Sequence, residues 1–132
     1  MRYVSTRGDA PILDFEDVLL SGLARDGGLY VPETWPAFSP ADFADMAGRP
    51  YTEVATRIVT PFAPSILEAD VASMVDAAYS TFSHPAVAPL AQLDANEFLL
   101  ELFHGPTLAF QDLAMHQLGQ LFSHVLTKRG EK

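Results

Sequence analysis

The pattern that most constrains the fold lies in residues 87–128, where two strand-like runs precede a turn and a long amphipathic helix. The runs span residues 87–93 and 97–103, and Asp94-Ala95-Asn96 between them suits a tight hairpin turn. Because a hairpin and one helix cannot bury both faces of a sheet, we expect this region to open a larger α/β domain that is cut off here. The alternative is that it packs on the preceding residues as one small α+β unit.

Residues 1–84 predict a small, mostly helical domain with a pair of short strands, and residues 85–132 predict the beginning of a second domain. Three helices carry recognisable N-caps, which are Asp14, Ser39 and Ser65. Gly27 and Gly28 are interpreted as the end of the first helix, because glycine accepts positive φ. The expected strands span residues 2–5 and 29–31, and the expected helices span residues 15–23, 40–46, 51–60, 66–79 and 112–128.

Composition excludes several classes of protein. The formal net charge is −9 and the eight Lys and Arg are scattered, so neither nucleic acid nor an anionic membrane is an expected partner. The chain has no cysteine, which removes disulfides, thiolate metal sites and cysteine nucleophiles. It also has no signal-peptide-like segment and no run of about 18 apolar residues. We therefore expect a cytoplasmic protein.

Residues 104–112 form the candidate site. The helix predicted to begin at Gln111 and Asp112 presents unpaired N–H groups and a partial positive charge at its start. A lysine in that place has its neutral amine favoured and can attack an aldehyde. The amide of Gln111 is neither basic nor nucleophilic, although it donates and accepts hydrogen bonds. By local spacing alone, the segment predicts an ordinary capped helix start.

The other motifs have simpler interpretations. The four histidines are too widely spaced for a zinc motif, so we expect them at surface or turn positions and expect no metal site. The segment 26–28, Asp-Gly-Gly, lacks the Lys-Ser/Thr of a phosphate-binding loop and predicts a helix-terminating turn. The carboxylates of Asp42, Asp45 and Glu53 predict a solvated face.

Three segments resemble those of the threonine synthase family and occur in the family's order. They are Tyr3–Gly8, Gly22–Pro32 and Glu101–Asp112, which together span nearly the whole chain. The resemblance implies a fold-type II enzyme of pyridoxal phosphate (PLP) that converts O-phospho-L-homoserine and water to L-threonine and phosphate. It implies that position 111 is where the family has the lysine that binds PLP. The possible pocket residues that it implies are His104, Thr107, Phe110 and Asp112.

Two departures separate this chain from the family's pattern. Gln111 replaces the lysine, and the sequence ends before the Ser/Gly/Thr-rich loop that cradles the PLP phosphate in the family. Lys128 lies about 17 residues along the helix, roughly 25 Å away at 1.5 Å per residue, and neither it nor Lys132 can serve the same pocket. We expect this chain alone to have no threonine synthase activity and no bound PLP. Exposed apolar surface would favour self-association.

Two further hypotheses stay open. A non-catalytic degenerate paralogue, or an interaction module, would keep the fold without the chemistry, and the Lys-to-Gln change motivates this reading. An unrelated small enzyme that uses His104 and Asp112 is a third class, but no assembled site in the sequence supports it.

Overall fold

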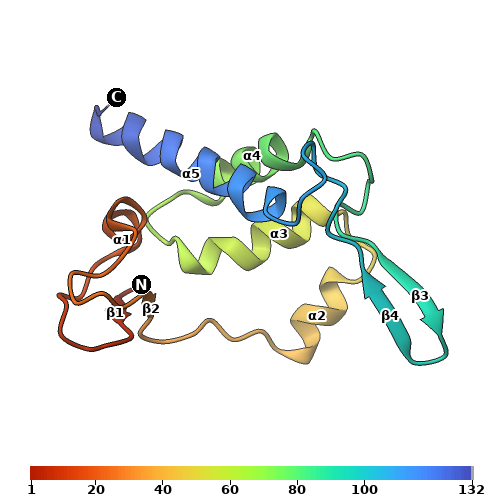
Figure 1. Ribbon diagram of the computed structural model, residues 1–132, viewed down its shortest axis with the longest axis horizontal. Helices are drawn as coiled ribbons and strands as arrows, with labels where there is room; N and C mark the ends of the chain where they lie inside the picture. The colour runs from red at the N-terminus through yellow and green to blue at the C-terminus, as the bar shows by residue number, and fades with distance from the viewer. Residues whose placement is uncertain (132) are drawn as a thin grey trace. The chain divides into compact units, whose positions relative to one another are not determined.

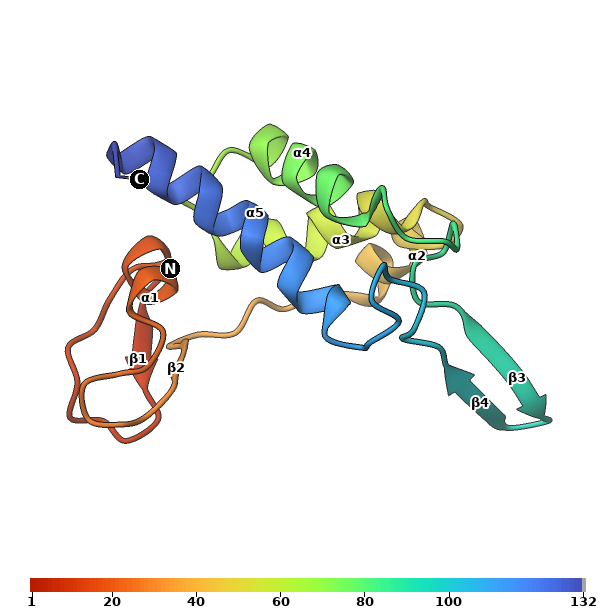
Figure 2. The same cartoon turned by 45° about the horizontal axis from the view of Figure 1, so that its top comes forward.

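The computed structural model describes residues 1–131, which form helices and short antiparallel strands (Figures 1 and 2). These residues divide into two compact units. Unit 1 contains residues 1–48 and 56–71, and unit 2 contains residues 49–55 and the described residues from 72 onward. In chain order the elements are β1 (Tyr3–Ser5), α1 (Phe15–Ser21), β2 (Tyr30–Pro32), α2 (Pro40–Met46), α3 (Tyr51–Val59), the 3-10 helix η1 (Thr60–Phe62), α4 (Glu68–Tyr79), β3 (Leu90–Asp94), β4 (Glu97–Leu100) and α5 (Asp112–Arg129).

This element order confirms the predicted fold class of helices combined with short strands, followed by a hairpin and a helix. The sheets are two separate antiparallel pairs, β1 with β2 and β3 with β4. The boundary between residues 84 and 85 stays a prediction.

In unit 1, α1 begins where the sequence predicts and ends earlier. The Asp14 side chain accepts the N–H of Asp17 at 3.0 Å, which confirms Asp14 as the N-cap. The prediction that the helix continues to Leu23 was wrong. The helix ends at Ser21 because Gly22 takes a φ of 67°, which turns the backbone out of the helix.

The Asp26 carboxylate organises the turn between α1 and β2. It accepts the Ser5 hydroxyl at 2.8 Å and the backbone N–H groups of Gly28 at 2.9 Å and Asp9 at 3.0 Å. The Gly28 N–H is the largest cause of a lowered pKa for Asp26, with the Ser5 hydroxyl next among the hydrogen bonds. A Cβ on Gly28 would lie 2.4 Å from Ser5 Oγ, so a larger residue would displace the Ser5 hydroxyl from its hydrogen bond with Asp26. The segment is therefore a turn that leads into β2, and its prediction as a helix end was wrong.

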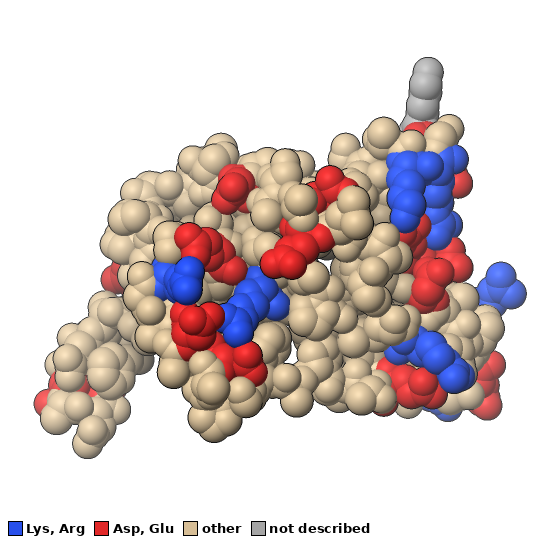
Figure 3. Space-filling model, turned by 180° about the vertical axis from the view of Figure 1, so that it is seen from behind, with Lys and Arg blue, Asp and Glu red and all other residues tan. Residues whose placement is uncertain are grey.

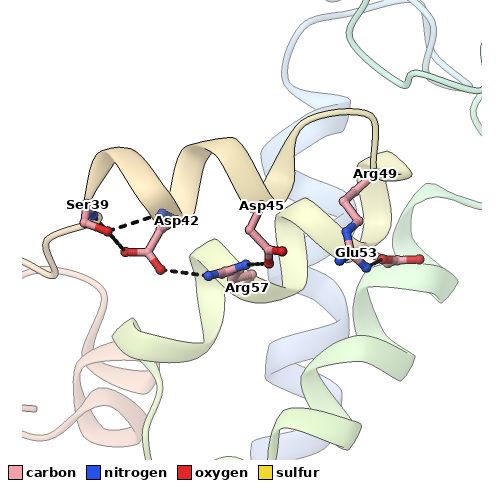
Figure 4. A network of polar contacts seen from close by, with 6 residues as sticks. All are labelled: Ser39, Asp42, Asp45, Arg49, Glu53 and Arg57. Carbon is pink, nitrogen blue, oxygen red and sulfur yellow. Dashed lines mark hydrogen bonds and ion pairs between the residues drawn. The ribbon is translucent and has the colours of Figure 1, made fainter.

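Helix α2 has the capping box expected of its sequence. Ser39 Oγ accepts the Asp42 N–H at 3.2 Å, and the Asp42 carboxylate accepts the Ser39 N–H at 2.8 Å. Arg57 on α3 pairs with Asp42 at 2.7 Å and also with Asp45, as Figure 4 shows. The α2 carboxylates lie at the surface, as predicted, and this pairing ties α2 to the end of α3 within unit 1.

Charged side chains of both signs are interspersed. On the face drawn in Figure 3, Lys and Arg stand in small separate groups beside Asp and Glu. Arg49 and Glu53, 3.4 Å apart in unit 2, are one such exposed pair, and pairs of this kind contribute about 0–1 kcal/mol.

Within residues 1–131, no helix has the length and apolar character needed to cross a membrane.

Helix α4 begins at Glu68, two residues later than predicted, so the prediction of Ser65 as its N-cap was wrong. The Leu67 carbonyl accepts the N–H groups of Asp70 and Val71, at 2.9 and 3.0 Å, and so closes the first turn. At its other end Tyr79 contacts the ring of Tyr51, with centroids 5.1 Å apart. The buried apolar residues of unit 2 include Met74, Val75, Ala78, Val87, Leu121 and Val125.

Strands β3 and β4 form the predicted hairpin, which extends as a two-stranded ribbon away from α5 in both cartoon views (Figures 1 and 2). Leu90 pairs with Leu100, so β3 begins later and β4 ends earlier than the sequence predicts. Val87 has a φ of 58°, which interrupts extended backbone before β3 begins. Large apolar side chains on the hairpin are exposed: Leu90, Leu93, Phe98, Leu99 and Leu100.

Helix α5 follows the site segment and confirms the predicted stop. Gly130 has a φ of 69°, and its N–H reaches the carbonyls of Leu126 and Thr127. Gln117 lies on the buried side of the helix, and neither of its amide atoms has a hydrogen-bond partner among residues 1–131.

Candidate functional site

The site segment runs from the end of β4, through a turn, into α5. The Thr107 N–H donates to one Asp112 carboxylate oxygen at 2.8 Å, and the Thr107 hydroxyl donates to the other at 2.7 Å. These two hydrogen bonds close the turn before the helix. Asp112 is 5% exposed, whereas Thr107 is exposed, so the buried carboxylate holds a surface turn in place.

The Asp112 carboxylate is stabilised in its charged form. The Thr107 hydroxyl is the largest cause of a lowered pKa for Asp112, with the Thr107 N–H and the nearby His116 also lowering it. Nε2 of His116 lies 3.9 Å from the carboxylate. The predicted pocket residues Thr107 and Asp112 are therefore brought into direct contact.

Gly105 makes the closest backbone approach in the segment. A Cβ on this residue would lie 2.3 Å from Asp112 Oδ2 and 2.4 Å from Asp112 Cβ. Real Cβ atoms do not occur at such distances, so a larger residue cannot fit without moving α5 or the turn. Glycine is required here by contact with Asp112.

The turn also contains a strained residue. Leu108 has a φ of 61°, in the left-handed region that glycine occupies more readily, and its N–H donates to the Gly105 carbonyl at 3.1 Å. Its side chain is 72% exposed, and that of Phe110 is also largely exposed. Non-glycine residues in this region cost roughly 1–3 kcal/mol each and occur often at functional sites.

Gln111 stands at the N-cap of α5, as the sequence predicts. Its backbone is already helical, with φ −61° and ψ −24°, and its side chain is exposed and makes no capping hydrogen bond. Its carbonyl accepts the N–H groups of Ala114 at 3.1 Å and Met115 at 2.8 Å. The side chain at position 111 is thus free to face a ligand, but it offers only an amide.

His104 is held by four neighbours. Its Nε2 lies 2.7 Å from a Glu101 carboxylate oxygen, and its carbonyl accepts the Ser83 N–H at 2.9 Å. The ring lies against those of His84 and Phe103, with centroids 5.0 and 4.8 Å apart. Sequence reasoning identified His104 but missed these partners.

Two of these partners left a signal in the sequence. Glu101 and Phe103 stand three residues and one residue before His104 inside the same segment, whereas His84 lies 20 residues away. His84 reaches His104 because the Ser83 backbone is bonded to the His104 carbonyl. Among residues 1–131, no group of three or more His, Asp or Glu side chains is arranged to hold a metal ion.

Comparison with known proteins supplies the family. Residues 2–79 match the family model described as the threonine synthase N terminus. The chain belongs to the threonine synthase family. The threonine synthase of Pseudomonas aeruginosa is 59% identical over 133 residues, an alignment that covers all of this chain and 28% of that protein.

Solved threonine synthases share the fold. The chain resembles the PLP-bound enzyme from Brucella melitensis with a TM-score of 0.97 and 56% identity, over 100% of this chain and 29% of that one. It resembles the yeast enzyme with a TM-score of 0.88 and 36% identity, over 97% of this chain and 27% of that one. The chain therefore spans less than a third of the length of these relatives. The alignments also cover residues 101–112, beyond the region of the family model.

Proposed function

We propose that this chain supplies the N-terminal part of a threonine synthase, which converts O-phospho-L-homoserine and water to L-threonine and phosphate with PLP as cofactor. The observation that carries the proposal is the similarity to threonine synthases along the whole chain, site segment included. In this proposal residues 1–84 form the N-terminal domain and residues 85–132 begin the catalytic domain.

We further propose that Gln111 occupies the position of the family's PLP-binding lysine. Gln111 is exposed at the start of α5, beside a turn held by Thr107 and Asp112, so its side chain is available to a ligand. Its chemistry does not fit covalent attachment of PLP, because an amide nitrogen is not a nucleophile. Lys128 lies near the far end of α5, roughly 25 Å along the helix, and cannot replace it. This chain is therefore inactive alone.

A chimera tests both parts of the proposal. Residues 1–132 replace the matching 133 residues of the Pseudomonas aeruginosa enzyme, once with Gln111 and once with Gln111→Lys. We expect the Gln111 chimera to release no phosphate from O-phospho-L-homoserine and to lack the absorbance of lysine-bound PLP. The Gln111→Lys chimera should regain both, with the parent enzyme as the control. Threonine formation by the Gln111 chimera would show that position 111 does not carry the essential lysine.

The second candidate is a non-catalytic paralogue or interaction module, and the amide at position 111 is the observation that favours it. It predicts a Gln111→Lys chimera that folds and stays inactive, because other site residues would also have diverged. It also predicts self-association of the 132-residue chain in sedimentation experiments, through exposed apolar side chains such as those of the hairpin.

A further inference from the structure

The contact between the side chains of Glu101 and His104 is the basis of a more specific inference. Glu101 leaves the hairpin with its N–H bonded to the Pro89 carbonyl at 2.9 Å, which fixes its backbone. His104 is fixed by Ser83, whose N–H and hydroxyl both donate to its carbonyl, at 2.9 and 3.2 Å. Both side chains are mostly buried, with 25% of Glu101 and 17% of His104 exposed. The contact between them therefore joins two anchored residues.

The chemistry of this contact selects one form of the imidazole. An ionised carboxylate only accepts hydrogen bonds, so the His104 nitrogen that faces it must carry a proton. At 2.7 Å the facing nitrogen is Nε2. In the neutral ring the proton then sits on Nε2, and Nδ1 is the acceptor. Among the described residues, no hydrogen bond to Nδ1 of His104 occurs.

His104 stands at the beginning of the turn before α5, and Gln111 stands at its end. The next residue, Gly105, packs against Asp112, and Asp112 follows Gln111 directly in the chain. The rings of His84 and Phe103 lie against His104 and restrict its rotation. The imidazole is therefore held near the start of α5, with Nε2 engaged and Nδ1 without a hydrogen bond to the described residues.

We propose that Glu101 is a positioning residue for His104. It holds the ring in the Nε2–H tautomer and leaves Nδ1 as a hydrogen-bond acceptor for a hydroxyl or ammonium group of a ligand bound at the start of α5. The role of Nδ1 toward a ligand rests on the proposed function, whereas the tautomer depends only on this chain.

The test is nitrogen NMR of the histidine rings in the 132-residue chain, at a pH where they are neutral. Two-bond correlation spectra distinguish the Nε2–H and Nδ1–H tautomers, and a protected ring N–H reports the hydrogen bond directly. We expect His104 to be the Nε2–H tautomer with a protected proton. Glu101→Ala should lose that protection, and Glu101→Gln should keep it in part, because the glutamine carbonyl still accepts.

Glu101→Lys is the decisive variant. An ammonium group only donates, so Nε2 must become the acceptor and the proton should move to Nδ1. Glu97→Ala, an exposed acidic position on β4, is the matched control and should leave the His104 spectrum unchanged. His84, whose Nδ1 accepts the Ala86 N–H at 3.1 Å, serves as the internal reference.

Two results would overturn the inference: an unprotected His104 ring in the unaltered chain, or an unchanged tautomer in Glu101→Lys. A purely structural contact would lower stability in the variants without moving the ring proton. These spectra need no PLP and no turnover, so their failure is separate from failure of the chimera.

Discussion

The hydroxyl of Tyr79 donates to the carbonyl of Leu113 at 2.9 Å and so links the last residue of α4 to the first turn of α5. Tyr79 is also the last residue matched by the family model. Within unit 2, the N-terminal family region thus directly supports the helix that carries Gln111 and Asp112. Burial raises the pKa of Tyr79, so the hydroxyl stays a donor at ordinary pH.

Removing this hydroxyl should loosen α5. Tyr79→Phe is expected to cost about 1 kcal/mol of the free energy of unfolding, because the Leu113 carbonyl loses a partly buried partner. Denaturant unfolding measures the cost as a lower midpoint at constant m-value. Tyr30→Phe is the matched control, because its hydroxyl donates to the Pro11 carbonyl at an exposed place. Equal effects of the two substitutions would show that burial of the Tyr79 bond is unimportant.

Gly105 should tolerate no side chain. Gly105→Ala places a Cβ 2.3 Å from the Asp112 carboxylate, and we expect a loss of roughly 1–3 kcal/mol in stability from the forced shift. Gly119→Ala, inside α5 with open space around its Cβ position, should instead stabilise by about 1 kcal/mol through helix propensity. Thermal or urea unfolding of the pair checks the opposite signs. A neutral Gly105→Ala would contradict the close packing against Asp112.

The Thr107–Asp112 contact should make stability depend on pH in acid. The pKa of Asp112 in the folded chain is lowered, mainly by the Thr107 hydroxyl. The ionised Asp112 carboxylate therefore stabilises the fold fully at pH values above the pKa of the unfolded chain, about 4. That effect is lost as the pH falls through the lowered folded pKa. Asp112→Asn should therefore flatten part of the acid limb of the stability profile.

The control for this profile is Asp76→Asn, which changes an exposed acidic residue of α4 in the same unit. Unfolding midpoints measured from neutral pH into acid separate the two variants. If both give the same profile as the unaltered chain, Asp112 is not among the carboxylates that set acid stability. Thr107→Val should reproduce the Asp112→Asn profile, because it removes the hydroxyl with little change of volume.

The chain should accept a lysine at position 111 without loss of stability. Gln111 is exposed and its side chain makes no capping bond, so Gln111→Lys should change the free energy of unfolding by less than about 0.5 kcal/mol. Gln117→Lys makes the same replacement at a buried position of the same helix, and should cost roughly 3 kcal/mol through an unpaired buried charge. Unfolding of both variants in urea tests the contrast. A large cost at position 111 would mean that the side chain packs against the protein.

Local chemistry explains why much of the fold was predictable from the sequence. Asp14 and Ser39 are N-caps because a side-chain oxygen satisfies nearby backbone N–H groups within three residues. Gly130 ends α5 because glycine takes the left-handed conformation at little cost. The end of α1 was misplaced because the sequence interpretation assigned the C-cap to Gly27 and Gly28, whereas the backbone leaves the helix at Gly22.

The candidate site was predictable only in part. The order of residue types in segment 101–112 was enough to predict the family, and the comparison with the Pseudomonas aeruginosa enzyme covers this segment. The roles of its members depend on distances that sequence spacing does not contain. Phe110 is exposed and remains a predicted pocket residue, whereas Thr107 and Asp112 have a defined hydrogen-bonded relationship.

The sequence by itself determined the family, the N-caps Asp14 and Ser39 and the amide at position 111, because each depends on residue types within local segments. Tertiary structure alone decided that Gly105 must be small, that Tyr79 supports α5 and that His84 lies against His104. These relationships need segments brought together by burial of the apolar core and by backbone hydrogen bonds between distant loops. Such contacts depend on the whole packed chain, so no local pattern specifies them.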